Sequence, residues 1–244
     1  MIRGMVGAFI NSAGIVFGGV LARVLKKPVS EANQTRAKVL LGVFTVWFGL
    51  SLTLSSLNGS AGRRFKQLAI VLLAMALGKL AGKLLRLQKL SNAAGRFATR
   101  KMAAPATGKP EFDNGFRVAT ALFCAAPLAI LGSVAEGLDP NGFSKVLCVK
   151  AVMDGLAAMA FSRTFGWGVI LSAIPVLAWE GAIIRCAALQ EHALRIQGLI
   201  DSINATDGLL IFSVALIILR LKKVAVAEYL PSLALAPLLT RWLL

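Results

Sequence analysis

The chain is poor in the residues that build most catalytic and metal sites. It has one histidine, His192, and three cysteines, Cys124, Cys148 and Cys186, which are far apart and show no C-x-x-C spacing. A disulfide framework or a zinc site is therefore not expected. The H-E-x-x-H, G-x-S-x-G and P-loop patterns are also missing. We predict that the protein is not an enzyme and uses no cofactor, while the sequence leaves any metal ligand unknown.

Acidic residues are also scarce, with 11 Asp and Glu against 27 Lys and Arg, a formal net charge of +16. In a soluble protein such an excess would suggest a nucleic-acid partner. Here 57% of the residues are hydrophobic and the mean hydropathy is +0.74, which excludes a water-soluble globule. We therefore attribute the basic excess to orientation in a membrane and predict no nucleic-acid partner.

What the chain has in abundance is long apolar runs. A bilayer core is crossed by about 20 helical residues, and backbone groups in lipid must be satisfied within the segment, so each run is predicted to be a helix. The fold class is therefore all-α, a polytopic transmembrane helical bundle of about eight spans. The range is six to eight, because the fifth run is the least apolar and prolines interrupt the eighth. The runs are 5–25, 39–57, 68–85, 116–134, 144–161, 165–183, 204–221 and 224–242.

The positions of Lys and Arg predict the orientation, because cytoplasmic loops carry the excess. With both chain ends outside, about two thirds of these residues fall on the cytoplasmic side. We predict a single integral membrane domain over residues 1–244, multi-pass in the inner membrane. Its basic cytoplasmic loop, about 86–115, is the only segment long enough for a linker or a surface helix. Anionic lipid headgroups are its expected partner, although a plain tether between two halves explains it as well.

Two parts of the chain repeat each other. Met153-Asp154-Gly155-Leu156 corresponds to Thr206-Asp207-Gly208-Leu209, and each lies in a run predicted to pass from outside to inside. This pattern suggests repeated helical hairpins of the same orientation. Chance similarity in an apolar chain of low complexity is an equally good explanation.

Small residues recur at four-residue intervals in the first and third runs. Gly14 and Gly18 form one such stripe, and Ala74, Gly78 and Gly82 form another. Stripes of this kind let helix backbones approach closely in a membrane. We favour seams within the chain over seams between protomers, which leaves a homo-oligomer as an open alternative.

Asp154 and Lys150 are the charged residues placed deepest in a predicted span. An ionised side chain at a helix centre costs roughly 2.5–3.5 kcal/mol on insertion scales and usually faces a partner or a cavity. The i,i+4 spacing puts both on one helix face. They form either an internal ion pair that lets the span insert or a proton or cation site.

Other polar residues and prolines in the spans have two interpretations each. Asp207 is either an N-terminal cap, which we favour, or part of a site. Asn11 either forms a hydrogen bond between helices or binds the transported ligand. Glu180 is interpreted as an interfacial carboxylate beside Trp179, and only a cavity shared with Asp154 would make it a site residue. Pro127 and Pro175 each free a backbone carbonyl, which marks either a simple kink or a substrate pathway.

Several stretches together resemble a known family. They are Leu122–Ser133, Lys150–Gly155, Gly168–Pro175 and Leu230–Pro237, with Asn11 near the start. They resemble the bacterial membrane-protein family called domain-of-unknown-function family 554, or YdfK/YqgA-like. The resemblance implies a polytopic inner-membrane protein of unassigned activity, sometimes described as a transporter. In that family an amide usually stands at the position of Glu180, so the resemblance assigns no role to Glu180.

We predict a small inner-membrane transporter or channel for an ion or small polar solute. Its midplane site is expected to contain Asp154, Pro127 and Pro175, with Asn11 and Asp207 contributing polar atoms and Lys150 tuning the carboxylate. The alternative is a non-transporting membrane scaffold or assembly protein, in which Lys150 and Asp154 form a structural pair. An intramembrane enzyme is not expected, because no nucleophile and base stand at a workable spacing.

Overall fold

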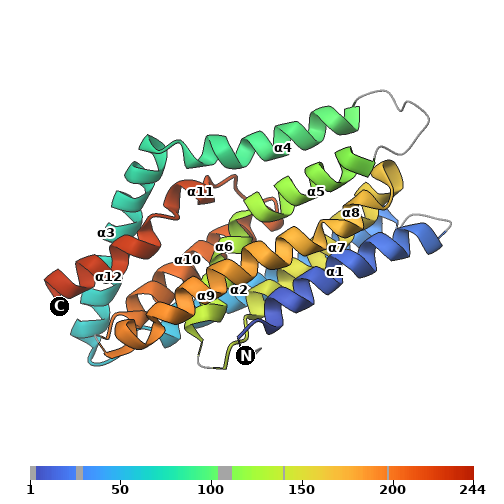
Figure 1. Cartoon of the computed structure of the whole chain (residues 1–244). Helices are drawn as coiled ribbons and strands as arrows, with labels where there is room; N and C mark the ends of the chain where they lie inside the picture. The colour runs from blue at the N-terminus through green and yellow to red at the C-terminus, as the bar shows by residue number, and fades with distance from the viewer. Residues whose placement is uncertain (1–3, 26–29, 104–111, 140, 197) are drawn as a thin grey trace. The chain divides into compact units, whose positions relative to one another are not determined.

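The computed structural model describes residues 4–25, 30–103, 112–139, 141–196 and 198–244. These residues form α-helices and no strand (Figure 1). Contacts divide the chain into two compact units: unit 1 is Met1–Lys38 with Ser91–Arg185, and unit 2 is Val39–Leu90 with Cys186–Leu244. The prediction of one membrane domain stays a prediction.

Unit 1 is built mainly from helices of the first and middle parts of the chain. They are α1 (Val6–Val24), α4 (Leu87–Ala103), α5 (Phe112–Ala125), α6 (Pro127–Leu138), α7 (Lys145–Phe165), α8 (Gly168–Leu171) and α9 (Ala173–Ile196). The first turn of α4 and the end of α9 belong to unit 2. Unit 2 otherwise contains most of α2 (Glu31–Ser55), α3 (Ala61–Leu84), α10 (Ile200–Ile218), α11 (Val226–Tyr229) and α12 (Ser232–Leu243).

The prediction of an all-helical membrane fold is confirmed. Five described helical segments are long and apolar enough to cross a membrane, and the α5–α6 pair, bent by 57°, makes a sixth if it counts as one span. Each of the eight predicted runs lies on a helix or on a broken pair of helices. The runs on α7 and on α11–α12 do not meet the same criteria, since α7 carries several charges and α12 has 12 residues.

In unit 1, α1 and α7 pack along the Gly14–Gly18 stripe. A Cβ on Gly155 would lie 2.9 Å from the Gly14 carbonyl oxygen, and a Cβ on Gly18 would overlap the Gly155 carbonyl. Residue numbers rise together along this contact, so the two helices run in the same direction, as predicted for the first and fifth runs. This seam joins two helices of one chain.

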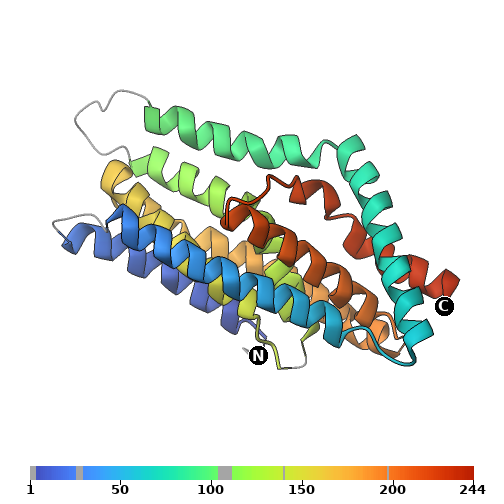
Figure 2. The ribbon, with the colours of Figure 1, turned by 180° about the vertical axis from the view of Figure 1, so that it is seen from behind.

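In unit 2, α2 and α10 pack in a similar way but run in opposite directions (Figure 2). A Cβ on Gly49 would lie 2.6 Å from the Gly208 carbonyl oxygen. The Thr53 hydroxyl donates to the Gly49 carbonyl at 2.9 Å and to the Ala205 carbonyl at 3.3 Å. The second predicted stripe lies on α3, where Gly78 contacts Ser232 of α12 and Gly82 contacts Glu228 of α11.

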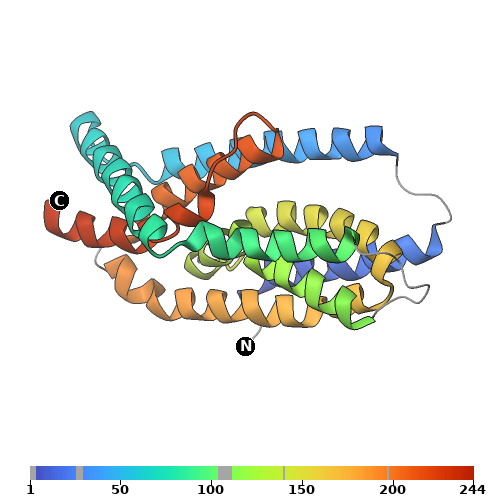
Figure 3. The same ribbon diagram turned by 90° about the horizontal axis from the view of Figure 1, so that it is seen from above.

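The predicted basic loop is largely helical. Helix α4 covers Leu87–Ala103, and α5 begins at Phe112. Phe97 and Ala98 of α4 pack against the core of unit 1 beside Phe123 of α5, and α4 runs along the α5 side of that unit (Figure 3). Burial of this one apolar stripe explains why a segment rich in basic residues folds as a helix.

Candidate functional site

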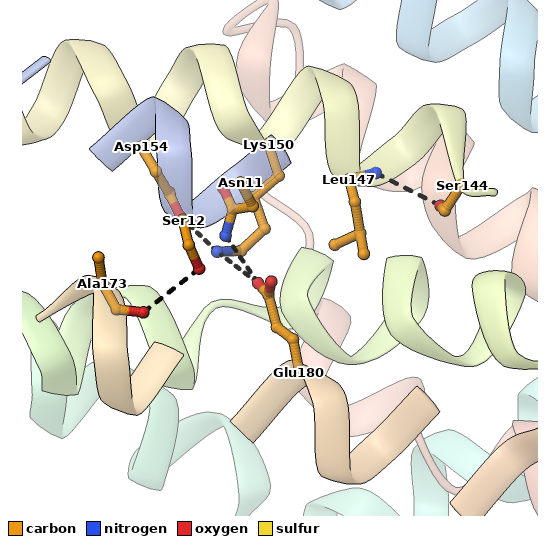
Figure 4. Close-up of polar contacts among 8 residues, drawn as sticks. All are labelled: Asn11, Ser12, Ser144, Leu147, Lys150, Asp154, Ala173 and Glu180. Atoms are coloured by element: carbon orange, nitrogen blue, oxygen red, sulfur yellow. Dashed lines mark hydrogen bonds and ion pairs between the residues drawn. The ribbon is translucent and has the colours of Figure 1, made fainter. Parts of the chain in front are cut away.

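Lys150 lies at the centre of a buried group of polar side chains in unit 1. Its ammonium forms an ion pair with Asp154, one turn further along α7, and a second with the Glu180 Oε1 atom of α9 at 3.1 Å (Figure 4). Lys150 is 1% exposed, Glu180 is 0% exposed and Asp154 is 8% exposed. One lysine is thus shared by two carboxylates from two helices.

Asn11 of α1 brings a third helix to the same point. Its Nδ2 atom donates to Glu180 Oε1 at 2.8 Å, so this carboxylate oxygen accepts from both Asn11 and Lys150. The Glu180 Oε2 atom and the Asn11 Oδ1 atom have no hydrogen-bond partner within the described residues. We call Asn11, Lys150, Asp154 and Glu180 the lysine cluster.

The formal charges of the lysine cluster do not balance. Two carboxylates face one ammonium, which leaves one negative charge in excess when all three groups are ionised. A buried charge without a counter-charge is expensive, so such a group takes up a proton or pairs with a cation. The cluster can therefore hold a proton or a small cation, and its two unpartnered oxygens are available as acceptors.

Backbone packing fixes the positions of the three helices. Asn11 lies about one turn before Gly14, where α1 comes close to α7. It therefore faces Lys150, the first residue of the Lys150–Asp154 pair on α7. The Ser12 hydroxyl donates to the Ala173 carbonyl at 3.2 Å, which ties α1 to the first turn of α9. Glu180 lies about two turns further along α9, and its carboxylate contacts the Lys150 ammonium from the α9 side (Figure 4).

The two prolines differ in their effect. Pro127 is the first residue of α6 and marks the 57° bend after α5. At this bend the Ser91 hydroxyl donates to the Ala125 carbonyl at 3.3 Å. Pro175 lies in the first turn of α9, where a missing amide removes no helical bond. The sixth run is instead interrupted at Ser172, between α8 and α9.

Asp207 is not an N-terminal cap, and that interpretation is wrong. Helix α10 begins at Ile200, so Asp207 lies about two turns inside it. It is 1% exposed, and neither carboxylate oxygen has a hydrogen-bond partner in the described part of the chain. Asp207 belongs to unit 2, whereas Asn11, Lys150 and Asp154 meet within unit 1.

Sequence reasoning missed two buried glutamates. Glu180 was expected at the membrane interface, but it is buried and bound to Lys150. Glu136 of α6 was not considered, although it is an acidic residue in the apolar stretch 131–138. Its Oε1 atom accepts the Gly7 amide of α1 at 2.8 Å, and its Oε2 atom has no described partner. Glu136 thus caps the first turn of α1, where the helix dipole favours a negative charge.

The described residues contain no group of three or more His, Cys, Asp or Glu side chains placed to hold a metal ion. Two surface hollows are described. One lies between α4 and the α5–α6 bend, and the other lies in unit 2 around Asp201; neither is lined by a residue of the lysine cluster.

Comparison with known proteins gives a family but no activity. The chain is 27% identical over 234 residues to "Uncharacterized membrane protein YdfK" of Bacillus subtilis (strain 168), covering 96% of this chain and 94% of that protein. It is 28% identical over 248 residues to "Uncharacterized protein YqgA" of Escherichia coli (strain K12), covering 98% and 97%. No solved structure matches the chain. The family model "Protein of unknown function (DUF554)" matches residues 6–241, and the chain therefore belongs to the DUF554 family.

Proposed function

We propose that this membrane protein transports an ion or a small polar solute across the bacterial inner membrane, with the lysine cluster as its binding site. The observation that carries the proposal is the excess carboxylate of the cluster, buried in a helical membrane protein. Charged groups in such positions commonly mark ion or proton pathways. A proton or a small cation fits this negative excess best.

In this proposal Glu180 receives the ligand and Asp154 holds Lys150. A proton on Glu180 would neutralise the excess charge and weaken its pairing with the ammonium, which Asp154 would retain. A small cation would use Glu180 Oε2 and Asn11 Oδ1 as ligands. The 57° bend before Pro127 gives the α5–α6 pair a place to move.

The test is ion flux in proteoliposomes. The purified chain is reconstituted with a pH-sensitive dye inside, and proton entry is followed under an imposed potassium diffusion potential, with sodium and potassium gradients tested in parallel. Ion flux in liposomes that contain the wild-type protein should exceed the flux in protein-free liposomes. Asp154→Asn and Glu180→Gln should fall to the protein-free level, whereas Glu31→Gln, an exposed acidic residue at the start of α2, should not. Equal flux in wild type and Asp154→Asn would remove Asp154 from the mechanism.

A scaffold without transport is the second candidate, and one observation favours it. Both carboxylates of the cluster are bound to Lys150. A scaffold predicts no flux in wild type under any gradient. It also predicts that Asp154→Asn lowers the stability in detergent markedly, by the roughly 3–5 kcal/mol that loss of one partner of a buried pair costs. The transport proposal predicts that Asp154→Asn stays folded and loses only about 1–2 kcal/mol, because Glu180 still neutralises Lys150.

A further inference from the structure

The charged residues of helix α4 are all basic. It carries Lys89, Arg96, Arg100 and Lys101 and no Asp or Glu. Phe97 and Ala98 on its inner face pack into the core of unit 1, while Lys89, Arg96 and Arg100 are exposed. A basic amphipathic helix in a membrane protein is suited to anionic lipid.

An open groove of about 540 Å³ lies between α4 and the α5–α6 bend. This volume falls within the roughly 300–1,000 Å³ typical of ligand pockets. The groove lies entirely within unit 1. The Ser91 hydroxyl, which donates to the Ala125 carbonyl at 3.3 Å, connects its two walls.

The two walls of the groove have different chemistry. Asn92, Arg96 and Thr99 stand on the α4 wall at i, i+4 and i+7, so their polar ends share one face. Leu122 and Ala125 form the opposite, apolar wall. A ligand that has a charged part and an apolar part can satisfy both walls at once, whereas a free inorganic anion uses only one.

We propose that this groove binds an anionic phospholipid of the phosphatidylglycerol type. The phosphate lies at Arg96, and the glycerol and upper acyl carbons lie against Leu122 and Ala125. The charge of α4 and the amphiphilic walls select a lipid, and the surrounding bilayer supplies it. The inference does not depend on transport.

Gly95 offers a way to test the groove without changing charge. It lines the groove, and a Cβ built on it meets nothing within 4 Å. Gly95→Leu should therefore fill the groove, and it also favours the helix. Gly62→Leu on α3 is the matched control, because Gly62 is equally open and lies elsewhere.

The experiment is native mass spectrometry of the full chain in detergent, titrated with dihexanoyl-phosphatidylglycerol, dihexanoyl-phosphatidylcholine or inorganic phosphate. Phosphatidylglycerol should bind most tightly. Arg96→Gln should weaken it roughly fivefold, the effect of one basic residue near a lipid phosphate, and Gly95→Leu should weaken it at least as much. Arg100→Gln, which removes a charge of the same helix outside the groove, and Gly62→Leu should leave binding unchanged.

Four results would overturn the proposal. Equal binding of the two lipids would show that the phosphatidylglycerol headgroup is not recognised. Equal losses for Arg96→Gln and Arg100→Gln, or full binding by Gly95→Leu, would show general attraction to a basic helix instead of a groove. Inorganic phosphate binding as tightly as phosphatidylglycerol would identify a free anion as the ligand.

Discussion

Asp154 in unit 1 and Asp207 in unit 2 each precede a glycine that packs against a second helix. Gly155 lies against Gly14 of α1, and Gly208 lies against Gly49 of α2. The electrostatic settings of the two carboxylates nevertheless differ. Asp154 pairs with Lys150 one turn earlier, whereas the position one turn before Asp207 is Ile203, and Asp207 has no described hydrogen-bond partner. A shared packing motif therefore does not imply a shared role.

The largest expected effect comes from removing the lysine of unit 1. Lys150→Met leaves Asp154 and Glu180 buried without a counter-charge, and loss of one partner of a buried pair costs about 3–5 kcal/mol. Ile203→Met, at the matching position of unit 2, should cost less than about 1.5 kcal/mol. Thermal unfolding in detergent measures both, and equal losses would show that the Lys150 ion pairs do not distinguish the units.

The glycines test the feature that the units share. Gly155→Ala and Gly208→Ala each place a methyl group on a neighbouring backbone, and overpacking of this kind costs about 1–3 kcal/mol. The two losses should be similar, while Gly62→Ala in open space should cause none. A loss confined to one unit, read from the shift of the unfolding midpoint, would mean that only one seam is tightly packed.

Neutralising the two aspartates should have effects of opposite sign. Asp207→Asn replaces a buried carboxyl group that has no described hydrogen-bond partner by a neutral amide, so stability at neutral pH should rise by about 1 kcal/mol. Asp154→Asn removes one of two ion pairs of Lys150, and the loss should be about 1–2 kcal/mol, because Glu180 remains. The readout is again the unfolding midpoint. A clear loss of stability in Asp207→Asn would show that this carboxylate has a stabilising partner.

The smallest expected effects concern hydroxyl groups that join helices. Ser12 of unit 1 donates to the Ala173 carbonyl, and Thr53 of unit 2 donates to the Ala205 carbonyl. Interhelical hydrogen bonds in membranes contribute about 0.6 kcal/mol on average, so Ser12→Ala and Thr53→Val should each cost about that much. Losses several times larger in one unit, measured by denaturant titration, would identify a polar network there.

Much of the fold could be predicted from apolar run length and small-residue spacing, because both act locally along a helix. The runs coincide with helices, and the Gly14–Gly18 stripe packs as predicted. Helix α4 was predicted less well, since its apolar stripe is short and its composition is typical of a loop as well as of a surface helix. The start of α10 at Ile200 was also missed, which led to the capping interpretation of Asp207.

The sequence alone determined that this is a helical membrane protein with Lys150 and Asp154 on one face of one helix, because hydropathy and the i,i+4 relation require no tertiary information. Only the tertiary structure decided that Glu180 and Asn11 join that pair, and that one lysine serves two carboxylates. Contacts between α1, α7 and α9 depend on which helix faces pack together. That choice depends on side-chain shape across more than 160 residues of chain separation, as between Asn11 and Glu180, whose positions differ by 169.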